Sequence, residues 1–243
     1  MTFTLQRILV PVDFGEASAA AVSLAVKLAQ GCGAEVTLLH AEALEAPVYF
    51  TSDQVEKLAR ERRSRRAQAQ KYLEAFGRRH AHGADVPVKA VIETRPPIEA
   101  IEQRVSDTDL IVIGTHGRSG PSLWWLGSVT ERVLRNTTRP VLVVHAHDQE
   151  RPAVEKLAVY AAPGLRGEAA LALASRIGRA FGAQVADRRA DAPLVSEMFD
   201  DVWLVVVAEP AVHDRQWRTS VGEPLIRAGA GPVLFVPEAT LSS

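Results

Sequence analysis

Short apolar runs rich in β-branched residues alternate with helix-like segments, and this order restricts the fold more than any other feature of the chain. The strand-like runs are Ile8–Val12, Glu35–Ala41, Val86–Ile92, Leu110–Ile113 and Val141–His145. Parallel strands need crossover helices, so this order predicts an α/β fold with a doubly wound, mostly parallel five-stranded sheet. Ligands of such Rossmann-like sheets bind at the carboxyl ends of the strands.

Glycines follow the fourth of these runs in a pattern typical of phosphate binding. Gly114 ends the strand, Gly117 and Gly127 follow it, and Ser128 opens the next helix. Glycine lets the backbone pass close to a bulky anion, and the free N–H groups and positive dipole end of a helix attract negative charge. We interpret the segment Asp109–Thr130 as a phosphate cradle.

The spacing of this cradle resembles the nucleotide-binding motif of the universal stress protein family. Two residues separate Gly114 from Gly117, nine separate Gly117 from Gly127, and the resemblance extends to the segments Ile8–Asp13 and Arg139–His145. It implies an adenine nucleotide alpha hydrolase-like fold that binds ATP with Mg²⁺, a role in the stress response, and a homodimer. The chain departs from the family pattern at Phe14-Gly15 and at Glu93-Thr94, near the ribose.

The resemblance also predicts which residues contact the nucleotide. Along the adenine and ribose it places Pro11, Val12, Asp13, Ala41 and Ile113, and along the phosphates Gly114, His116, Gly117, Gly127, Ser128, Val129 and Thr130. We add Arg118, because its charge could meet the terminal phosphate. The Thr130 hydroxyl is expected on a phosphate or on a hydrated metal ion.

Each of these residues also has a structural interpretation. Asp13 could cap the turn after the first strand, the glycines could serve turns alone, and Ala41 and Ile113 could be core residues. The sequence Ser128-x-x-Glu131 reads as a capping box, in which the serine hydroxyl caps an early helical N–H group.

The carboxyl-terminal part repeats the amino-terminal part in shortened form, which predicts a first copy over residues 1–147 and a second copy over residues 153–243. An offset of 149 residues aligns Arg7–Val36 with Lys156–Val185, and an offset of 92 then aligns the cradle. The change of offset predicts a truncated, three-stranded α/β copy without the second strand, second helix and third strand. The cradle residues change as follows: Asp13 to Ala162, Gly114 to Val206, Gly117 to Glu209 and Gly127 to Thr219. We expect the second copy to have lost nucleotide binding.

Composition restricts the partners and the location. The formal net charge of −1 argues against a nucleic-acid partner, and the sequence offers no apolar segment long enough to cross a membrane. The single cysteine, Cys32, and the absence of a signal sequence predict a cytoplasmic protein. The pairs His80/His82 and His145/His147 lack a third ligand nearby in sequence, so we read them as solvent-exposed.

The sequence predicts a binding module without catalytic residues. Gly127 stands where a P-loop would have its lysine, and no nucleophile elbow or metal triad is found. The favoured hypothesis is an ATP-dependent regulatory module, with slow hydrolysis at most. The alternatives are a slow ATPase or an enzyme that transfers phosphate or adenylate, and a ligand-free scaffold. The last strands, Val141–His145 and Val233–Pro237, would be exposed edges unless the two copies pair through them.

Overall fold

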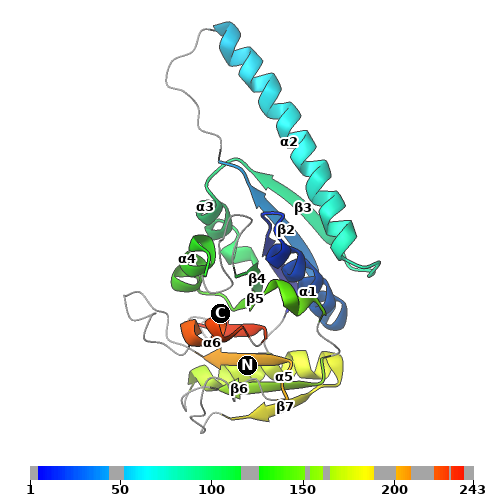
Figure 1. The fold of residues 1–243 in the computed structure, drawn as a ribbon, viewed down its shortest axis with the longest axis vertical. Coiled ribbons are helices and arrows are strands. Elements are labelled where there is room, and N and C mark those ends of the chain that lie inside the picture. The colour runs from blue at the N-terminus through cyan, green and yellow to red at the C-terminus, as the bar shows by residue number, and fades with distance from the viewer. Residues whose placement is uncertain are drawn as a thin grey trace.

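A computed structural model describes residues 5–43, 52–115, 126–150, 154–160, 165–188, 201–208, 222–229 and 231–237. Their strands form one nine-stranded sheet with the order β3-β2-β1-β4-β5-β9-β8-β6-β7 (Figure 1). Among these residues, no helix combines the length and apolar character needed to cross a bilayer.

The first copy contributes five parallel strands, as predicted. In chain order the elements are β1 (Arg7–Pro11), α1 (Glu16–Cys32), β2 (Glu35–Ala41), α2 (Ser52–His80), β3 (Val88–Glu93), α3 (Pro97–Glu102), η1 (Val105–Asp107), β4 (Leu110–Gly114), α4 (Ser128–Asn136), β5 (Val141–Val144) and η2 (Ala146–Glu150). The strands pair in parallel from β3 through β5. The alternation of short apolar runs with helices therefore produces the doubly wound α/β sheet that it predicts.

The second copy repeats the strand order of the first. Its elements are β6 (Lys156–Tyr160), α5 (Leu165–Phe181), β7 (Gln184–Asp187), β8 (Leu204–Ala208), α6 (Gly222–Ala228) and β9 (Val233–Val236). The order β7-β6-β8-β9 mirrors β2-β1-β4-β5, and the sheets join where β5 pairs antiparallel with β9. The hydrogen-bonding edges of both last strands are thereby used within the chain.

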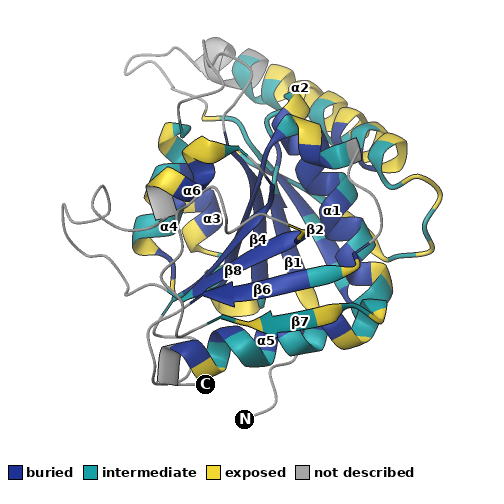
Figure 2. Ribbon diagram, turned by 60° about the horizontal axis from the view of Figure 1, so that its bottom comes forward, coloured by how far each residue is buried: buried dark blue, intermediate teal, exposed yellow. Residues whose placement is uncertain are grey.

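Helices cover both faces of the sheet, and each face has its own apolar core. On one face α1, α2 and α5 contribute residues such as Leu24, Leu73 and Leu173, and on the other α3, α4 and α6 contribute Ile101, Val133 and Leu225. The central strands are buried and the outer helix surfaces are exposed (Figure 2). Parallel strands covered on both faces are apolar throughout, which explains their nearly continuous β-branched runs.

Two details of the predicted second copy are wrong. It keeps a short version of the second strand, β7, so its described residues contribute four strands, and among them no counterpart of α2 or β3 is found. The alignment of the fourth strand is also displaced by two residues, because Ile8 pairs with Leu110 and the equivalent Leu157 pairs with Leu204. Gly114 therefore corresponds to Ala208, not to Val206. Side chains alternate along a strand with a period of two, so a two-residue shift keeps every apolar residue on its own face and leaves no trace in the pattern.

Candidate functional site

The predicted site lies where the chain reverses its direction of winding. From β1 the chain passes to its neighbour β2 on one side, whereas β4 lies on the other side of β1. The carboxyl ends of β1 and β4 therefore flank the crevice at which doubly wound sheets bind their ligands. Asp13 lies two residues after the end of β1, and Thr115 directly follows β4.

Asp13 takes part in the turn between β1 and α1. Its Oδ1 accepts a hydrogen bond from the backbone N–H of Gly15 at 3.0 Å, and Gly15 is the N-cap residue of α1. Between them, Phe14 adopts a left-handed backbone conformation with φ of 65°. The carboxylate thus has the structural role that the sequence offered as an alternative, and it holds the turn at the site.

Aromatic side chains pack around this turn, and the sequence indicates this only through its departure from the family pattern at Phe14. The Phe14 ring lies 4.5 Å from His40, 4.6 Å from Tyr72 and 5.4 Å from Phe76, measured between ring centroids. The Nδ1 atom of His40 donates to the Val12 carbonyl oxygen at 2.7 Å. Phe14 therefore anchors the end of β1 to α2, a contact that pairs residues too distant in sequence to be recognised from it.

Gly114 provides a close approach between β4 and helix α1. A Cβ atom at this position would lie 2.8 Å from the carbonyl carbon and the Cβ of Ala17, and 3.1 Å from the Ala17 oxygen. Such distances are well below normal carbon contacts. The glycine was predicted to admit a phosphate, and in the structure the space beside its Cα is filled by the first turn of α1.

The amino terminus of α4 points its backbone toward the same edge of the sheet. Gly127 is the N-cap residue, and the first intrahelical bond runs from the Glu131 N–H to the Gly127 oxygen at 2.9 Å. The N–H groups of Ser128, Val129 and Thr130 precede that bond, as the first amides of any helix do. Gly127 itself donates to the Thr115 oxygen at 2.6 Å, which ties the helix start to the end of β4.

The capping box predicted for this helix is wrong. Ser128 is the first helical residue and not the cap, and none of the described side chains caps the helix. Glu131, which would have reached back, instead forms an ion pair with Arg135 at 2.5 Å, one turn further along. An i, i+4 pair of this kind competes successfully with the backbone for the glutamate.

Thr130 makes a contact other than the one predicted for its hydroxyl. The side chain is 3% exposed, and its Oγ1 donates to the Gly114 carbonyl oxygen at 2.7 Å. A hydroxyl has one proton to donate. The Thr130 hydroxyl can therefore accept from a water on a metal ion, but it has no proton left for a phosphate oxygen.

The other predicted residues divide by burial. Val12 and Ile113 are buried, and Pro11 and Ala41 are half-buried at the strand ends. Ala41 pairs with Glu93 of β3, whose carboxylate lies 2.8 Å from Arg104 and 3.4 Å from Arg95. The hydrogen bond from Arg104 lowers the pKa of Glu93, with the charge of Arg95 adding to the effect. Two guanidinium groups thus offset the negative charge that replaces the expected glycine. His116, Gly117 and Arg118 lie outside the described residues.

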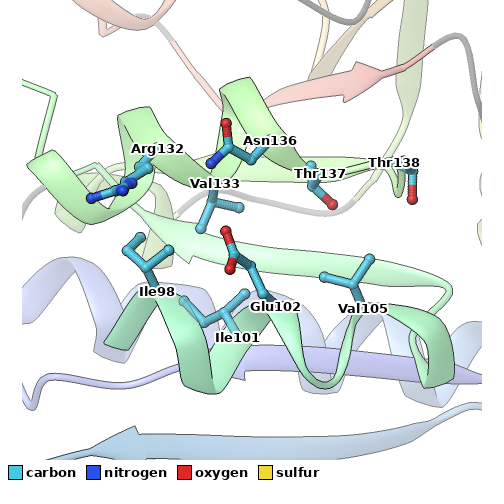
Figure 3. A pocket seen from close by; sticks show the side chains of 9 residues that line it. All are labelled: Ile98, Ile101, Glu102, Val105, Arg132, Val133, Asn136, Thr137 and Thr138. Atoms are coloured by element: carbon cyan, nitrogen blue, oxygen red, sulfur yellow. The ribbon is translucent and has the colours of Figure 1, made fainter. Parts of the chain in front are cut away.

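Two cavities bounded by described residues lie away from this site. One cavity of about 290 Å³ lies between α3 and α4 (Figure 3). It is lined by apolar side chains such as Ile101 and Val133, and by the exposed residues Glu102 and Arg132. Another, of about 520 Å³, lies at the opposite edge of the sheet, beside Arg7 and Glu35. Neither contains a residue predicted to contact the nucleotide.

Comparison with known proteins identifies the family of the chain. The model of the universal stress protein family matches residues 4–145. The chain belongs to the universal stress protein family. It is 28% identical over 165 residues to a universal stress protein of Methanocaldococcus jannaschii, a match that covers 59% of this chain and 97% of that protein.

A solved structure shares the fold of this universal stress protein over nearly its whole length. A universal stress protein from Archaeoglobus fulgidus covers 95% of this chain and 98% of its own, with a TM-score of 0.67 and 15% identity. Another universal stress protein, solved in complex with cAMP, is 23% identical with a TM-score of 0.43 and covers 59% of this chain and 98% of its own. The resemblance first noted in the glycine spacing is confirmed at the level of the family and the fold.

Proposed function

We propose that this universal stress protein binds ATP with Mg²⁺ at the carboxyl ends of β1 and β4, and acts as a nucleotide-dependent regulatory module in the stress response. The observation that carries the proposal is the amino terminus of α4, whose cap residue Gly127 donates its N–H to the oxygen of Thr115, the residue that follows β4. Backbone N–H groups at such a position bind phosphates without any charged side chain.

The residues at this edge suit the nucleotide and its metal ion. The amides of Ser128, Val129 and Thr130 would meet the phosphates. The Asp13 carboxylate, which orders the turn before α1, would face the ribose. The Thr130 oxygen retains lone pairs for a water of the Mg²⁺ shell, because its proton is donated to Gly114. The metal ion would offset phosphate charge in the complex.

A regulatory role fits these groups better than catalysis. The ionisable groups described at the crevice are few, and Glu93, the acid beside Ala41, is already paired with two arginines. General acid–base catalysis needs a group free to exchange a proton with substrate. We therefore propose that bound ATP changes association with partners, and that hydrolysis, where it occurs, is slow.

Any homodimer of this chain would need a surface other than its last strands. Residues Val141 and Val143 of β5 already pair with Phe235 and Val233 of β9. The outer strands of the sheet are β3 and β7. We propose that self-association, which the family resemblance favours, uses surfaces outside the β5–β9 pair.

The test removes one backbone N–H group from the start of α4, where the phosphates are proposed to bind, without disturbing the helix. Ser128→Pro removes the N–H of the first helical residue, where proline is well tolerated. The preceding Gly127 already has φ of −63° and ψ of 145°, which a following proline accepts. Ser128→Ala is the matched control, because it removes the exposed hydroxyl and keeps the amide.

Titration calorimetry with Mg-ATP measures both variants. A hydrogen bond to a charged group contributes about 1.5–3 kcal/mol, so Ser128→Pro should raise the dissociation constant roughly tenfold or more. Ser128→Ala should stay within about twofold. Equal affinity of the proline variant and the wild type would refute the cradle. Absence of ATP binding in the wild type would favour the scaffold, and release of phosphate over many turnovers would favour the enzyme.

A further inference from the structure

A cluster of two histidines and one aspartate joins the end of β5 to helix α6. His145 follows β5, and His147 and Asp148 belong to η2. Their ligand-type atoms all lie within 4.8 Å of one another. The sequence reading of His145 as solvent-exposed is wrong, since it is 4% exposed and Asp148 is 0% exposed. The third ligand that sequence spacing did not reveal is Asp148, brought close by the 3-10 turn.

The buried ring of His145 has one nitrogen bonded and one nitrogen directed at the carboxylate. Its Nε2 lies 2.9 Å from the carbonyl oxygen of Ile226, an atom that can only accept, so Nε2 carries the proton. In neutral His145, Nδ1 therefore presents a lone pair. Among the described residues Nδ1 has no hydrogen-bond partner, and it lies 3.5 Å from Asp148 Oδ2. A lone pair facing a carboxylate is repulsive unless a positive charge lies between them.

The distance between His145 Nδ1 and Asp148 Oδ2 fits a bridging metal ion better than a shared proton. An N–H···O bond places its heavy atoms about 2.9–3.0 Å apart. Two ligands bound at about 2.0–2.1 Å in tetrahedral geometry lie about 3.3–3.4 Å apart, close to the separation seen between His145 and Asp148. The remaining carboxylate oxygen, Oδ1, lies 3.8 Å from His147 Nε2.

The surroundings hold the ligand groups as protein metal sites do. Ligating histidines donate their other ring N–H to a carbonyl or carboxylate, and ligating carboxylates are themselves hydrogen-bonded. His145 donates to Ile226, and Asp148 Oδ2 accepts the backbone N–H of His145 at 2.8 Å. The His147 ring stacks on that of His145 with centroids 5.2 Å apart, and its Nε2 lies 2.8 Å from the Gly229 oxygen. This side chain is 53% exposed, and because its Nε2 donates to the Gly229 carbonyl, its Nδ1 is the atom that would bind a metal ion.

We propose that His145, His147 and Asp148 bind a divalent transition-metal ion of the Zn²⁺ class, with solvent in the remaining position. Two imidazoles and one carboxylate favour Zn²⁺ over Mg²⁺ or Ca²⁺, which prefer sets composed of oxygen. The ion would neutralise the buried carboxylate. Because the two histidines also bond the carbonyls of Ile226 and Gly229, it would lock α6 of the second copy onto the end of the first copy.

The test uses the full chain, freed of metal by dialysis against a chelator and studied without nucleotide. Titration calorimetry with ZnCl₂ measures affinity, and the visible absorption of bound Co²⁺ reports a tetrahedral site. His147→Ala removes an exposed ligand with little effect on folding. Asp148→Asn removes the negative charge of the carboxylate ligand. His82→Ala is the matched control, because it removes an exposed histidine that lies far in sequence from the cluster.

The wild type and His82→Ala should bind one equivalent of Zn²⁺ and show the Co²⁺ spectrum. Loss of a group that merely orients a metal ligand weakens binding about 10–100-fold, so His147→Ala should lose at least about tenfold. Zn²⁺ should also raise the melting temperature of the wild type more than that of His147→Ala. Equal binding by His147→Ala and the wild type, or no binding by the wild type, would overturn the proposal and leave the cluster as a hydrogen-bonded contact.

Discussion

Replacing Gly114 with alanine tests how tightly helix α1 is seated on the sheet. The added Cβ would lie 2.8 Å from two atoms of Ala17, one of them a backbone carbon. Carbon atoms pack at about 3.5–4.0 Å, so α1 or β4 would have to move by roughly 0.7 Å or more. Overpacking costs about 1–3 kcal/mol, and we expect the upper end because a backbone atom cannot rotate away.

A smaller opposing effect comes from the unfolded chain. Alanine restricts that chain more than glycine, which stabilises the folded state by about 0.4–1 kcal/mol. The net expectation is a loss of about 2 kcal/mol of unfolding free energy. Urea denaturation followed by circular dichroism measures it as a lower midpoint at an unchanged slope. ATP affinity should fall as well, because the turn formed by Asp13 and Gly15 leads directly into α1.

Gly77→Ala is the matched control, since its Cβ would also approach another atom closely. The neighbour there is Leu38 Cδ1 at 2.7 Å, the end of a flexible side chain. Gly77 lies inside α2, where alanine is favoured over glycine by about 0.5–1 kcal/mol. This variant should be as stable as the wild type or slightly more so. If Gly114→Ala unfolds at the same urea concentration as Gly77→Ala, the packing argument is refuted.

Two further predictions concern the hydrogen bond of Thr130 and the titration of His80. Thr130→Val leaves the buried Gly114 carbonyl without its donor and should cost about 1–3 kcal/mol, whereas Thr130→Ser should retain most of the stability; equal urea midpoints for the two variants would contradict this. Burial lowers the pKa of His80 below its usual 6.5, with Arg79 and His82 adding to the effect. The folded protein then binds this proton less readily than the unfolded chain, so the contribution of His80 to stability is full above pH 6.5 and falls as the pH drops below that value. Between pH 7.5 and 5.5, the wild type should therefore lose more stability than His80→Gln, and parallel losses would count against the assignment.

Much of the site could be predicted from the sequence because its position depends on the order of strands. Strand β4, Gly114 and the start of α4 at Ser128 lie where the spacing predicts them. The roles of individual groups could not be predicted, because they depend on which atoms meet across the fold. Thr130 and Ser128 illustrate this, since the first donates to Gly114 and the second caps nothing among the described residues.

The internal repeat, too, could be predicted from the sequence only in part. Local patterns revealed that the carboxyl-terminal part resembles the amino-terminal part, but a two-residue shift in β8 and the survival of β7 escaped them. A two-residue shift preserves the alternation of faces, and a four-residue strand such as Gln184–Asp187 is too short to show a period of its own.

The sequence by itself determined the succession of strands and helices, the glycine spacing after β4 and hence the family, because periodicity and backbone freedom are local properties of the chain. The tertiary structure alone decided that Gly114 faces Ala17, that Phe14 meets Tyr72, and that His145 is buried beside Asp148. These contacts arise from the angle and distance at which whole elements pack, which no short stretch of sequence encodes.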